Sequence, residues 1–573
     1  MNWENVYHEW KNFENLDKTV KESLDNYTHK QIEDAFYEPL SFGTAGMRGQ
    51  LGAGINRMNI YTVRQATKGL ALFMESVGEE AKQKGVAIAY DSRHQSAEFA
   101  LEAAKVLGVH GIPSYLCQEL RPTPELSFAV RHFQTFAGIM ITASHNPAEY
   151  NGYKVYGSDG GQMPPQDADA LTTFIRSIDS PLTIDVLTQT ELEEKGLLHL
   201  QGEQLDKAYL DLVKTVTVNP ALVKEMAKEM TLVFTPLHGA GKELGEKALK
   251  QAGFESVYLV KEQAIPDGNF STVALPNPED PKAFEYAIAL GKETSADVLI
   301  ATDPDADRLG AAVKMSNGEY RVITGNQIAS LMLDYLLNAH IQAGTLPKNG
   351  AVAKSIVSSE LPSKIAAHYQ VEMVNVLTGF KFIADKIKQY ESDLSKTFLF
   401  GFEESYGYLV KPFVRDKDAI QALVLLAEVA AYYKKKGQTL YDGLQAIYEK
   451  YGYFLEETIS VTLSGIEGVA KIQSLMAKFR KEQLKTFGQI DVSMTQDFKN
   501  SKSIHQNGQE TSLDMPSADV LKYILQDGSW VAIRPSGTEP KIKFYIGVCA
   551  TTQEEAQEKL RAIQVSIDEL LEA

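Results

Sequence analysis

The chain has 573 residues, too many for one hydrophobic core, so we expect about three to five domains. Its composition, 44% hydrophobic and 23% charged, is ordinary for a soluble globular protein, and the formal net charge of −18 argues against a protein built to hold nucleic acid. Two cysteines, Cys117 and Cys549, imply no disulfide framework and suit a reducing compartment.

The N-terminal segment, residues 1–16, is polar and acidic, unlike a signal peptide. The longest apolar stretch, AIQALVLLAEVAAYY from Ala419, is shorter than a membrane span and contains Gln421 and Glu428. We therefore expect a buried core helix there, a cytoplasmic protein and no membrane partner.

Apolar runs followed by polar loops predict strands buried on both faces. They are GVAIAYDSR (from Gly85), FAGIMITASHNP (from Phe136), TLVFTPLHGAG (from Thr231), DVLIATDPDADR (from Asp297) and KTFLFGFEES (from Lys396). Helical periods lie between them; in residues 326–340, for example, Ile328, Leu331, Tyr335 and Ala339 share one helix face. This alternation predicts α/β domains with mixed, mainly parallel sheets.

The C-terminal part reads differently. WVAIRPSGTEPKIKFYIGV (from Trp530) predicts two strands around a glycine-containing loop, and residues 552–573 predict a charged amphipathic helix, together an α+β domain. We expect three related α/β domains at residues 1–205, 206–322 and 323–450, and the α+β domain at residues 451–573. Ligand sites in open α/β sheets lie beyond the carboxyl ends of strands, where the unusual polar clusters fall.

The first cluster, Thr142-Ala143-Ser144-His145-Asn146-Pro147, offers a serine suited to be a nucleophile or phosphate carrier. A Ser–His–Asp hydrolase is disfavoured because the G-x-S-x-G elbow is absent and because imidazole rarely reaches the hydroxyl of an adjacent residue. A capped turn using Asn146 and Pro147 explains the cluster equally well when it is taken alone.

The second cluster, Asp303-Pro304-Asp305-Ala306-Asp307-Arg308, offers three carboxylates that can converge on one hard cation. An EF-hand fails because Arg308 and Lys314 stand where that loop needs glycine and glutamate. A solvated acidic turn is disfavoured by the apolar VLIA run that leads into the cluster. The cluster therefore predicts a Mg²⁺ site with coordination left for a phosphate oxygen.

The third cluster is Gly401-Phe402-Glu403-Glu404-Ser405. Adjacent carboxylates point to opposite sides of an extended backbone, so one could meet a sugar hydroxyl while the other serves structure. A surface glutamate pair is the alternative. Downstream, Arg415, Lys417 and Asp418 form a charged group suited to acid–base or phosphate roles.

The fourth cluster, Arg534-Pro535-Ser536-Gly537-Thr538-Glu539-Pro540, precedes Lys541 and Lys543. Arginine matches phosphate oxygens with a bidentate fork, and hydroxyl and backbone N–H groups beside a glycine can fold around an anion. An ordinary hairpin turn is the alternative.

Two further segments carry weaker signals. Gly239-Ala240-Gly241-Lys242 lacks the earlier glycine and the Ser/Thr of a Walker A loop, so an ATPase is not expected. Asp91-Ser92-Arg93 follows a strand, but a helix N-cap using Asp91 or Ser92 explains it as well as a functional role does.

A serine, a carboxylate metal site, a hydroxyl reader and a phosphate cradle together indicate phosphoryl transfer on a polyol. In this order the motifs TASHNP, DPDADR, GFEES and RPSGTEP resemble the α-D-phosphohexomutase family, which includes phosphoglucomutase and phosphomannomutase. The chain as a whole looks most like the family's bacterial glucose-specific members, whereas the spellings FGTAGMRG, DPDADR and SGTEPKIK look closest to a branch that includes phosphopentomutases. FGTAGMRG (42–49) and NGYK (151–154) match further family segments. The resemblance implies four domains around a central cleft, and a phosphoserine mutase that interconverts glucose 1-phosphate and glucose 6-phosphate through glucose 1,6-bisphosphate.

The resemblance also implies roles for single residues. Ser144 is the expected phosphoserine, whose phosphate completes one Mg²⁺ shell with Asp303, Asp305 and Asp307. The residues expected around the transferring phosphoryl group are Arg48, His145, Lys154 and Arg308. Those expected to hold the sugar or its second phosphate are Thr378, Gly379, Glu403, Ser405, Arg415, Arg534, Ser536, Gly537, Thr538 and Lys543.

The sequence departs from the family pattern at two places. Phe402 stands where many glucose-specific members have glycine, and Gly407 stands where some bacterial members have a histidine that is a candidate general base; Lys417 is the expected substitute. Phosphomannomutase and phosphopentomutase activities are therefore alternatives, with a phosphatase or a non-catalytic binding protein further removed. The expected partner is a small phosphosugar and the expected assembly a monomer or homodimer.

Overall fold

Two units make up the computed structural model, which describes residues 2–43, 46–463, 465–482, 484–536 and 541–572. Unit 1 comprises Met1–Ile328, Ile383–Gly401 and Ser405–Leu440. Unit 2 comprises Ala329–Phe382, Phe402–Glu404 and Tyr441–Ala573. Each unit is described by itself.

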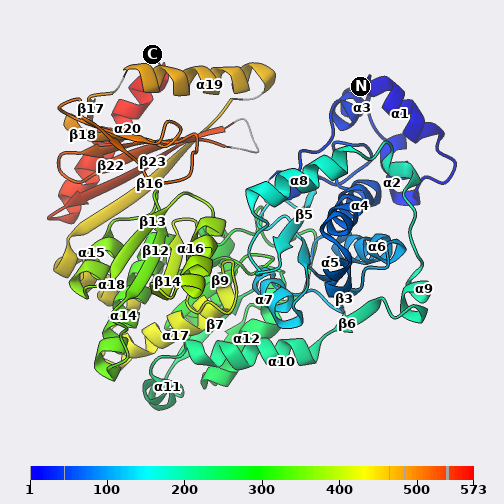
Figure 1. Ribbon diagram of the computed structural model, residues 1–573. Helices are drawn as coiled ribbons and strands as arrows, with labels where there is room; N and C mark the ends of the chain where they lie inside the picture. Colours follow the sequence, from blue (N-terminus) through cyan, green and yellow to red (C-terminus); the bar gives the residue numbers. More distant parts are fainter. Residues whose placement is uncertain (1, 44–45, 464, 483, 537–540, 573) are drawn as a thin grey trace. The chain divides into compact units, whose positions relative to one another are not determined.

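The first sheet of unit 1 has the strand order β1-β5-β4-β2-β3-β6 (Figure 1). Its central strands β2 (Val86–Tyr90) and β4 (Ala137–Ile141) pair in parallel, β3 (Ser114–Cys117) and β6 (Leu198–Gln201) continue the parallel part, and β5 (Tyr150–Gly157) pairs antiparallel with both β4 and β1 (Met47–Gln50). All residues of β4 are buried, which explains why its sequence is a continuous apolar run.

Helices flank this sheet. An Asn59–Thr62 capping box starts α4 (Ile60–Val77), which packs against α6 (Ser96–Val109) and α8 (Pro165–Arg176). The remaining helices of this part are α1 (Trp3–Asn12), α2 (Lys18–Asp25), α3 (His29–Phe36), α5 (Glu79–Lys84), α7 (Thr123–Phe133), α9 (Gln189–Glu194) and α10 (Glu203–Val213).

The second sheet of unit 1 has the order β11-β10-β9-β7-β8. Here β7 (Thr231–Thr235) pairs in parallel with β8 (Ser256–Leu259) and β9 (Val298–Thr302), while β10 (Leu309–Lys314) and β11 (Tyr320–Ile323) are antiparallel. Its helices are α11 (Pro220–Met226), α12 (Gly241–Ala252) and α13 (Glu285–Thr294). The apolar helix α17 (Ala419–Lys435) packs against α11, α12 and β9, and the carboxylate of Asp418 caps its first turn.

Four elements span points where the chain passes between the units: α14 (Gly325–Ala343), α16 (Phe380–Asp393), β14 (Thr397–Glu403) and α18 (Leu440–Tyr451). β15 (Gly407–Leu409) then lies in unit 1. Unit 2 contains the parallel pair β12 (Gly350–Ser355) and β13 (Glu372–Val376), with α15 (Leu361–His368) and most of α18.

The C-terminal part of unit 2 is an antiparallel sheet of order β16-β23-β22-β21-β18-β19-β20. Its strands are β16 (Tyr453–Thr462), β17 (Thr486–Phe487, paired with β18), β18 (Ile490–Asp497), β19 (Lys502–His505), β20 (Glu510–Ser512), β21 (Leu521–Leu525), β22 (Trp530–Pro535) and β23 (Lys541–Ala550). Helices α19 (Gly465–Glu482) and α20 (Gln553–Glu572) pack against β23 (Figure 1).

The predicted elements agree with the structure. All five apolar runs are strands, the helix expected over residues 326–340 is α14, and the two C-terminal strands and final helix are β22, β23 and α20. The stretch from Ala419 is a core helix as predicted, buried along most of its length. Among the described helices, none combines the length and apolarity needed to cross a membrane.

Candidate phosphoryl-transfer site

Ser144 lies on the loop between β4 and β5, here named the serine loop (residues 142–149). Its backbone is left-handed, with φ of 51°, a conformation that costs a non-glycine residue about 1–2 kcal/mol. The Ser144 N–H donates to Thr142 Oγ1 at 2.8 Å, and the Ser144 hydroxyl donates to Asp303 Oδ2 at 2.7 Å. The loop therefore directs the serine hydroxyl at the acidic cluster.

The ring of His145 corrects one argument made from the sequence. Its Nδ1 lies 3.2 Å from Ser144 Oγ, so adjacency does not keep the imidazole from the hydroxyl, because the left-handed backbone at Ser144 turns the ring back. Burial, with the nearby charges of Arg308 and Arg48, holds the pKa of His145 well below its usual value, so the ring is neutral at pH 7.

The three carboxylates lie on the metal loop (residues 303–308), which directly follows β9. Asp303, Asp305 and Asp307 are buried, and each offers an oxygen within 4.8 Å of the others. Burial, with the charges of the two neighbouring carboxylates, raises the pKa of Asp303. Confined together in this way, the carboxylates repel one another.

The donor set fits a hard divalent cation. Three carboxylates converge on one point, and Asp305 Oδ1 and Asp307 Oδ1 are buried without a hydrogen-bond partner in the described part of the chain. Oxygen ligands of this kind suit Mg²⁺ in particular when few of them come from the protein. The triad could therefore bind a metal ion.

Basic side chains surround the triad. Lys154 Nζ, carried by β5, lies 2.9 Å from Asp305 Oδ2, and it is joined there by the hydroxyl of Thr123 at 2.8 Å. Lysine and threonine both favour the charged carboxylate, and they hold the pKa of Asp305 well below its usual value although burial opposes this.

Two predicted arginines lie at the edges of this group. Arg48 on β1 donates to Asn146 Oδ1 of the serine loop at 2.9 Å. Arg308 ends the metal loop; its guanidinium donates at 2.9 Å to Glu279 Oε1 and at 2.9 Å to the Ser405 carbonyl oxygen. The expected phosphoryl-contact residues are thus brought together within unit 1, and Ser405 joins them through its backbone.

Lys417 is also brought to the triad. Its Nζ lies 3.1 Å from Asp307 Oδ2 and 3.0 Å from Asp416 Oδ1, and the residue is 7% exposed. A Cβ placed on Gly407 would lie 2.2 Å from Lys417 Cδ. The absence of a side chain at Gly407 therefore leaves the space that the lysine side chain occupies.

Arg415, two residues earlier, is not brought to the triad. Its guanidinium is buried, pairs with Glu391 and donates to the carbonyl oxygens of Pro412 and Val414, while its backbone N–H donates to Ser127 Oγ at 2.8 Å. These contacts give Arg415 a place in the packing of unit 1, and its substrate role stays a prediction.

The adjacent glutamates Glu403 and Glu404 have different partners in unit 2. Glu403 Oε1 accepts the Gly379 N–H at 2.7 Å, whereas Glu404 Oε2 accepts the Ser355 hydroxyl at 2.8 Å. Glu404 thus serves structure, as expected of one member of the pair. Beside Gly379, the buried hydroxyl of Thr378 has no hydrogen-bond partner among the described residues.

The phosphate cradle was predicted on the turn between β22 and β23. Arg534 and Lys543 are directly opposed across these strands, and both are partly exposed. Like charges in this arrangement repel, so a bound anion would relieve them. The Ser536 N–H donates to the Lys541 carbonyl oxygen at 2.8 Å, while Gly537 and Thr538 lie outside the described residues.

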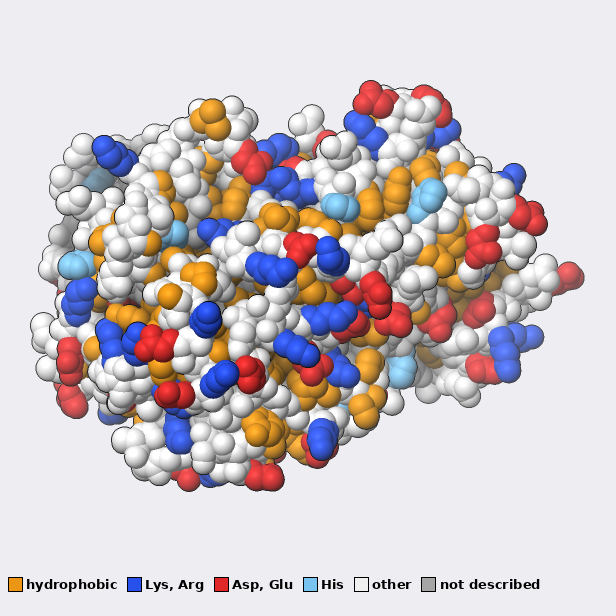
Figure 2. All heavy atoms as spheres, turned by 90° about the horizontal axis from the view of Figure 1, so that it is seen from below, with side chains coloured by type: hydrophobic (Ala, Val, Ile, Leu, Met, Phe, Trp, Pro, Cys, Tyr) orange, Lys and Arg blue, Asp and Glu red, His pale blue; other side chains and the backbone are white. Residues whose placement is uncertain are grey.

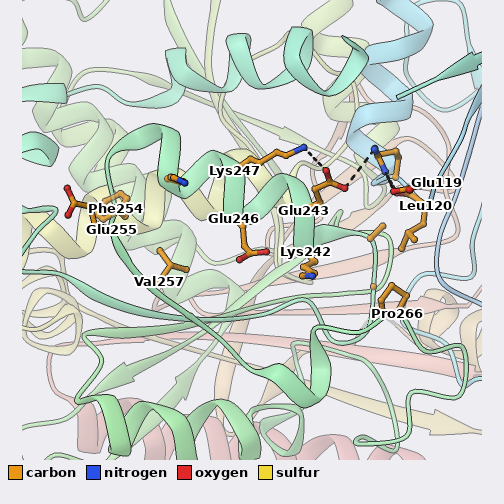
Figure 3. Close-up of a pocket in the computed structure, with 14 residues that line it drawn as sticks. Glu119, Leu120, Lys242, Glu243, Glu246, Lys247, Phe254, Glu255, Val257 and Pro266 are labelled. Atoms are coloured by element: carbon orange, nitrogen blue, oxygen red, sulfur yellow. Dashed lines mark hydrogen bonds and ion pairs between the residues drawn. The ribbon is translucent and has the colours of Figure 1, made fainter. Parts of the chain in front are cut away.

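A separate cavity of about 640 Å³ lies beside α12 (Figure 3). It includes the segment of the rejected Walker A motif. Its charged lining is balanced, with four cations and four carboxylates: Arg121, Lys242, Lys247, Lys250, Glu119, Glu243, Glu246 and Glu255. It contains none of the predicted site residues. On the face drawn in Figure 2, likewise, basic and acidic side chains are interspersed.

Asp91 and Arg93 lie beside the serine loop. Of the two interpretations of Asp91-Ser92-Arg93, the helix N-cap is wrong: α6 begins at Ser96, its N-cap position is Gln95, and Asp91 Oδ1 instead accepts the Arg93 N–H at 2.9 Å. Arg93 is buried and donates to the carbonyl oxygen of Ser144 at 2.7 Å. The signal was available, because a charged D-x-R group directly after a buried strand is unusual.

Comparison with known protein families places this arrangement. The descriptions "Phosphoglucomutase/phosphomannomutase, alpha/beta/alpha domain" I, II and III match residues 39–182, 207–317 and 324–451, and the C-terminal domain of the same family matches residues 470–564. The chain belongs to the phosphoglucomutase/phosphomannomutase family. The four matches follow the order of the four predicted domains, whose boundaries stay a prediction.

Similar members of the phosphoglucomutase/phosphomannomutase family include bacterial phosphoglucomutases. That of Staphylococcus epidermidis is 40% identical over 534 residues, which cover 92% of this chain and 94% of the relative. That of Staphylococcus aureus is 38% identical over 549 residues, which cover 96% of each chain. The predicted family, α/β fold class and isomerase class are confirmed.

Solved structures share the fold. The pp63/parafusin phosphoglucomutase of Paramecium has a TM-score of 0.67 at 18% identity, covering 93% of this chain and 95% of its own. A phosphoglucomutase/phosphomannomutase family protein of Burkholderia thailandensis has a TM-score of 0.64 at 17% identity, covering 92% of this chain and 96% of its own.

Proposed function

We propose that the chain is a phosphoglucomutase that interconverts α-D-glucose 1-phosphate and glucose 6-phosphate, with Ser144 as its phosphate carrier. The observation that carries the proposal is the contact between the Ser144 hydroxyl and Asp303, inside a buried group of three carboxylates and two lysines. The identity of 38–40% to bacterial phosphoglucomutases over almost the whole chain supports glucose as the sugar.

In the proposed reaction, phosphorylated Ser144 gives its phosphoryl group to the 6-hydroxyl of glucose 1-phosphate. The product is glucose 1,6-bisphosphate, which turns over in the site so that its 1-phosphate returns to Ser144. Transfer of this kind relies on positioning and on neutralising charge at the phosphoryl oxygens. Lys154, Arg308 and Arg48 supply that charge around the serine loop.

We assign Lys417 as the group that moves the proton. In the forward step Lys417, as the neutral amine, takes the proton of the attacking sugar hydroxyl while the bond between phosphorus and Ser144 Oγ breaks and Oγ leaves unprotonated. In the return step Ser144 Oγ attacks the 1-phosphate, and the protonated Lys417 gives its proton to the departing sugar oxygen. The support is its place beside the triad and the space that Gly407 leaves for its side chain. His145 is the weaker candidate because its Nδ1 already contacts the Ser144 hydroxyl at 3.2 Å.

Asp303, Asp305 and Asp307 would hold one Mg²⁺, which when bound neutralises charge on the phosphoryl oxygens. The contact between the Ser144 hydroxyl and Asp303 would hold the serine beside this ion. Two observations support a cation here: the carboxylates repel one another, and Asp305 Oδ1 and Asp307 Oδ1 are buried without a hydrogen bond from the described residues.

Residues of unit 2 are assigned to holding the sugar phosphate that does not react. Arg534 and Lys543 present two cations side by side, and Ser536, Gly537 and Thr538 complete the proposed cradle. Thr378, Gly379 and Glu403 are assigned to the sugar, because an unpartnered hydroxyl lies beside a carboxylate-bound backbone N–H.

Substrate comparison tests the proposal. Purified protein with Mg²⁺ and catalytic glucose 1,6-bisphosphate should convert glucose 1-phosphate with a higher kcat/KM than mannose 1-phosphate or ribose 1-phosphate. A clearly higher value for either rival would reassign the sugar while leaving the mutase chemistry in place. Release of inorganic phosphate without the isomeric product would instead make the protein a phosphatase.

A cytoplasmic location and a monomeric or dimeric state are also part of the proposal.

A further inference from the structure

The guanidinium of Arg93 binds the backbone of the serine loop and of Tyr150, the first residue of β5. Its Nη2 donates to the carbonyl oxygens of Ser144 at 2.7 Å and Asn146 at 2.5 Å, and its Nη1 donates to those of Pro147 at 2.8 Å and Tyr150 at 2.9 Å. The two terminal nitrogens carry four N–H groups in a planar fork, and four carbonyl oxygens receive them. Three carbonyl oxygens of the serine loop and that of Tyr150, at the start of β5, thus surround a single side chain.

Asp91 also fixes Arg93, through both the guanidinium and the backbone N–H of the arginine. Its Nε lies 3.4 Å from Asp91 Oδ2, and the other oxygen of Asp91 accepts both the Arg93 N–H and the Ser96 hydroxyl at 2.8 Å. The side chains of Arg93 and Asp91 are both fully buried. The charge therefore cannot relax into water if the loop moves.

A third contact comes from Phe270, which lies in the part of unit 1 that carries the second sheet. The ring of Phe270 packs over the guanidinium at 4.9 Å, and Phe270 has a left-handed backbone with φ of 49°. The backbone of the same segment also lies close to that of His94, the residue after Arg93: a Cβ added to Gly268 would lie 2.9 Å from the His94 backbone nitrogen. Arg93 is thus enclosed by Asp91, the serine loop and the segment of residues 267–273.

We infer that Arg93 is a positioning residue for phosphoryl transfer, which fixes the peptide at Ser144 so that the serine hydroxyl faces Asp303. Four carbonyl dipoles pointing at one place repel one another without a cation between them, and the left-handed Ser144 needs support from its surroundings. A lysine cannot replace the arginine, since its ammonium has three donors and no planar fork. This inference rests on the proposed role of Ser144 as phosphate carrier.

The test measures how fast dephosphorylated protein gains one phosphate from glucose 1,6-bisphosphate, by intact-protein mass spectrometry in a single turnover. Arg93→Lys keeps the charge opposite Asp91 and should fold, yet it should slow the gain by about 100-fold, since small misplacements of reacting groups cost about that much. Arg64→Lys is the matched control, because Arg64 is a largely buried arginine ion-paired with Glu102 elsewhere in the same part of unit 1.

Chemical rescue separates positioning from folding. In Arg93→Ala, guanidinium chloride well below its unfolding concentration should restore the rate at least about tenfold, because the free ion can occupy the vacated donor position. The same addition should leave Arg64→Ala unchanged. If Arg93→Ala does not fold, Arg93→Lys alone decides the question.

The outcomes are distinct. Normal phosphate gain in Arg93→Lys, or slowing no greater than in Arg64→Lys, would overturn the inference. Absence of phosphate gain in the wild-type protein would instead overturn the proposed function, because the wild-type result does not depend on any change at Arg93. A slow Arg93→Lys variant with thermal stability close to that of Arg64→Lys would support the positioning role.

Discussion

The serine and metal loops of unit 1 differ from the predicted phosphate cradle of unit 2 in how their charged side chains are arranged. In unit 1, Ser144 is 4% exposed and the three aspartates are at most 2% exposed. Asp305 has a lysine at 2.9 Å and Asp307 has one at 3.1 Å. In unit 2, Arg534 and Lys543 are partly exposed and face each other with like charge.

The difference separates two tasks. A buried and pre-arranged group can stabilise charge that develops during reaction, because it does not need to reorganise and water does not screen it. Partly exposed cations suit a group that must bind and release. Variants of unit 1 should therefore lower kcat, whereas variants of the cradle should raise KM.

The largest effect among these variants is expected from Asp305→Asn. It removes one charge of the triad and the partner of Lys154, and loss of metal-dependent charge stabilisation is worth several kcal/mol, so kcat should fall about 1,000-fold or more. Steady-state kinetics at saturating Mg²⁺ measures this. Asp297→Asn, which removes an aspartate paired with Lys434 in the same unit, should stay within about threefold of wild type. A near-normal kcat in Asp305→Asn would contradict the claim that the buried group of unit 1 stabilises charge during the reaction.

Lys417→Met should lower kcat by about 100- to 10,000-fold with little change in KM, the range for loss of a general acid–base group. Gly407→Ala should act in the same direction without touching the charge, because its Cβ would collide with the lysine side chain. The comparison variant is Lys434→Met. If Gly407→Ala has full activity, the path of Lys417 does not depend on the glycine.

Arg534→Ala should act mainly on KM. A lost charge-assisted hydrogen bond is worth about 1.5–3 kcal/mol, so KM for glucose 1-phosphate should rise about 10- to 150-fold. Arg480→Ala removes another arginine of unit 2, one paired with Asp497 and Asp519, and should leave KM unchanged. A fall in kcat alone would contradict the assignment of the cradle to binding.

The smallest effect concerns a buried charge group of unit 2 with no assigned role in reaction. Lys522 Nζ donates to the Ile356 carbonyl oxygen at 2.6 Å and lies 3.7 Å from Glu360, which also pairs with Lys354, and its ammonium packs over Trp530. Burial, with the charge of Lys354, lowers the pKa of Lys522 to about 7.

This lowered pKa makes stability depend on pH. Between pH 7 and about 10 the unfolded chain binds this proton and the folded chain does not, so the free energy of unfolding should rise with pH by up to about 1.4 kcal/mol per unit. Denaturant unfolding at pH 7, 8 and 9 measures the slope. Lys522→Met should reduce it while leaving kcat unchanged, and an unaltered slope would show that Lys522 is charged in the fold.

Much of the fold followed from the sequence because buried parallel strands need continuous apolar runs. TASHNP and DPDADR also could be placed from sequence, since each directly follows such a strand. Lys417 could also be expected to stand in for the histidine missing at Gly407, but the packing of its side chain into the space at that glycine could not be predicted, because only the folded backbone defines this space. The same holds for Arg93, whose four acceptors are backbone carbonyl oxygens with no signature in residue type.

The most direct test of the account follows the mass of the intact protein after incubation with glucose 1,6-bisphosphate and Mg²⁺. We predict the gain of one phosphate in the wild-type protein, its absence in Ser144→Ala, and its transfer to sugar when glucose 1-phosphate is added. A wild-type protein that converts substrate at full rate while its mass stays unchanged under these exchange conditions would contradict the phosphoserine mechanism.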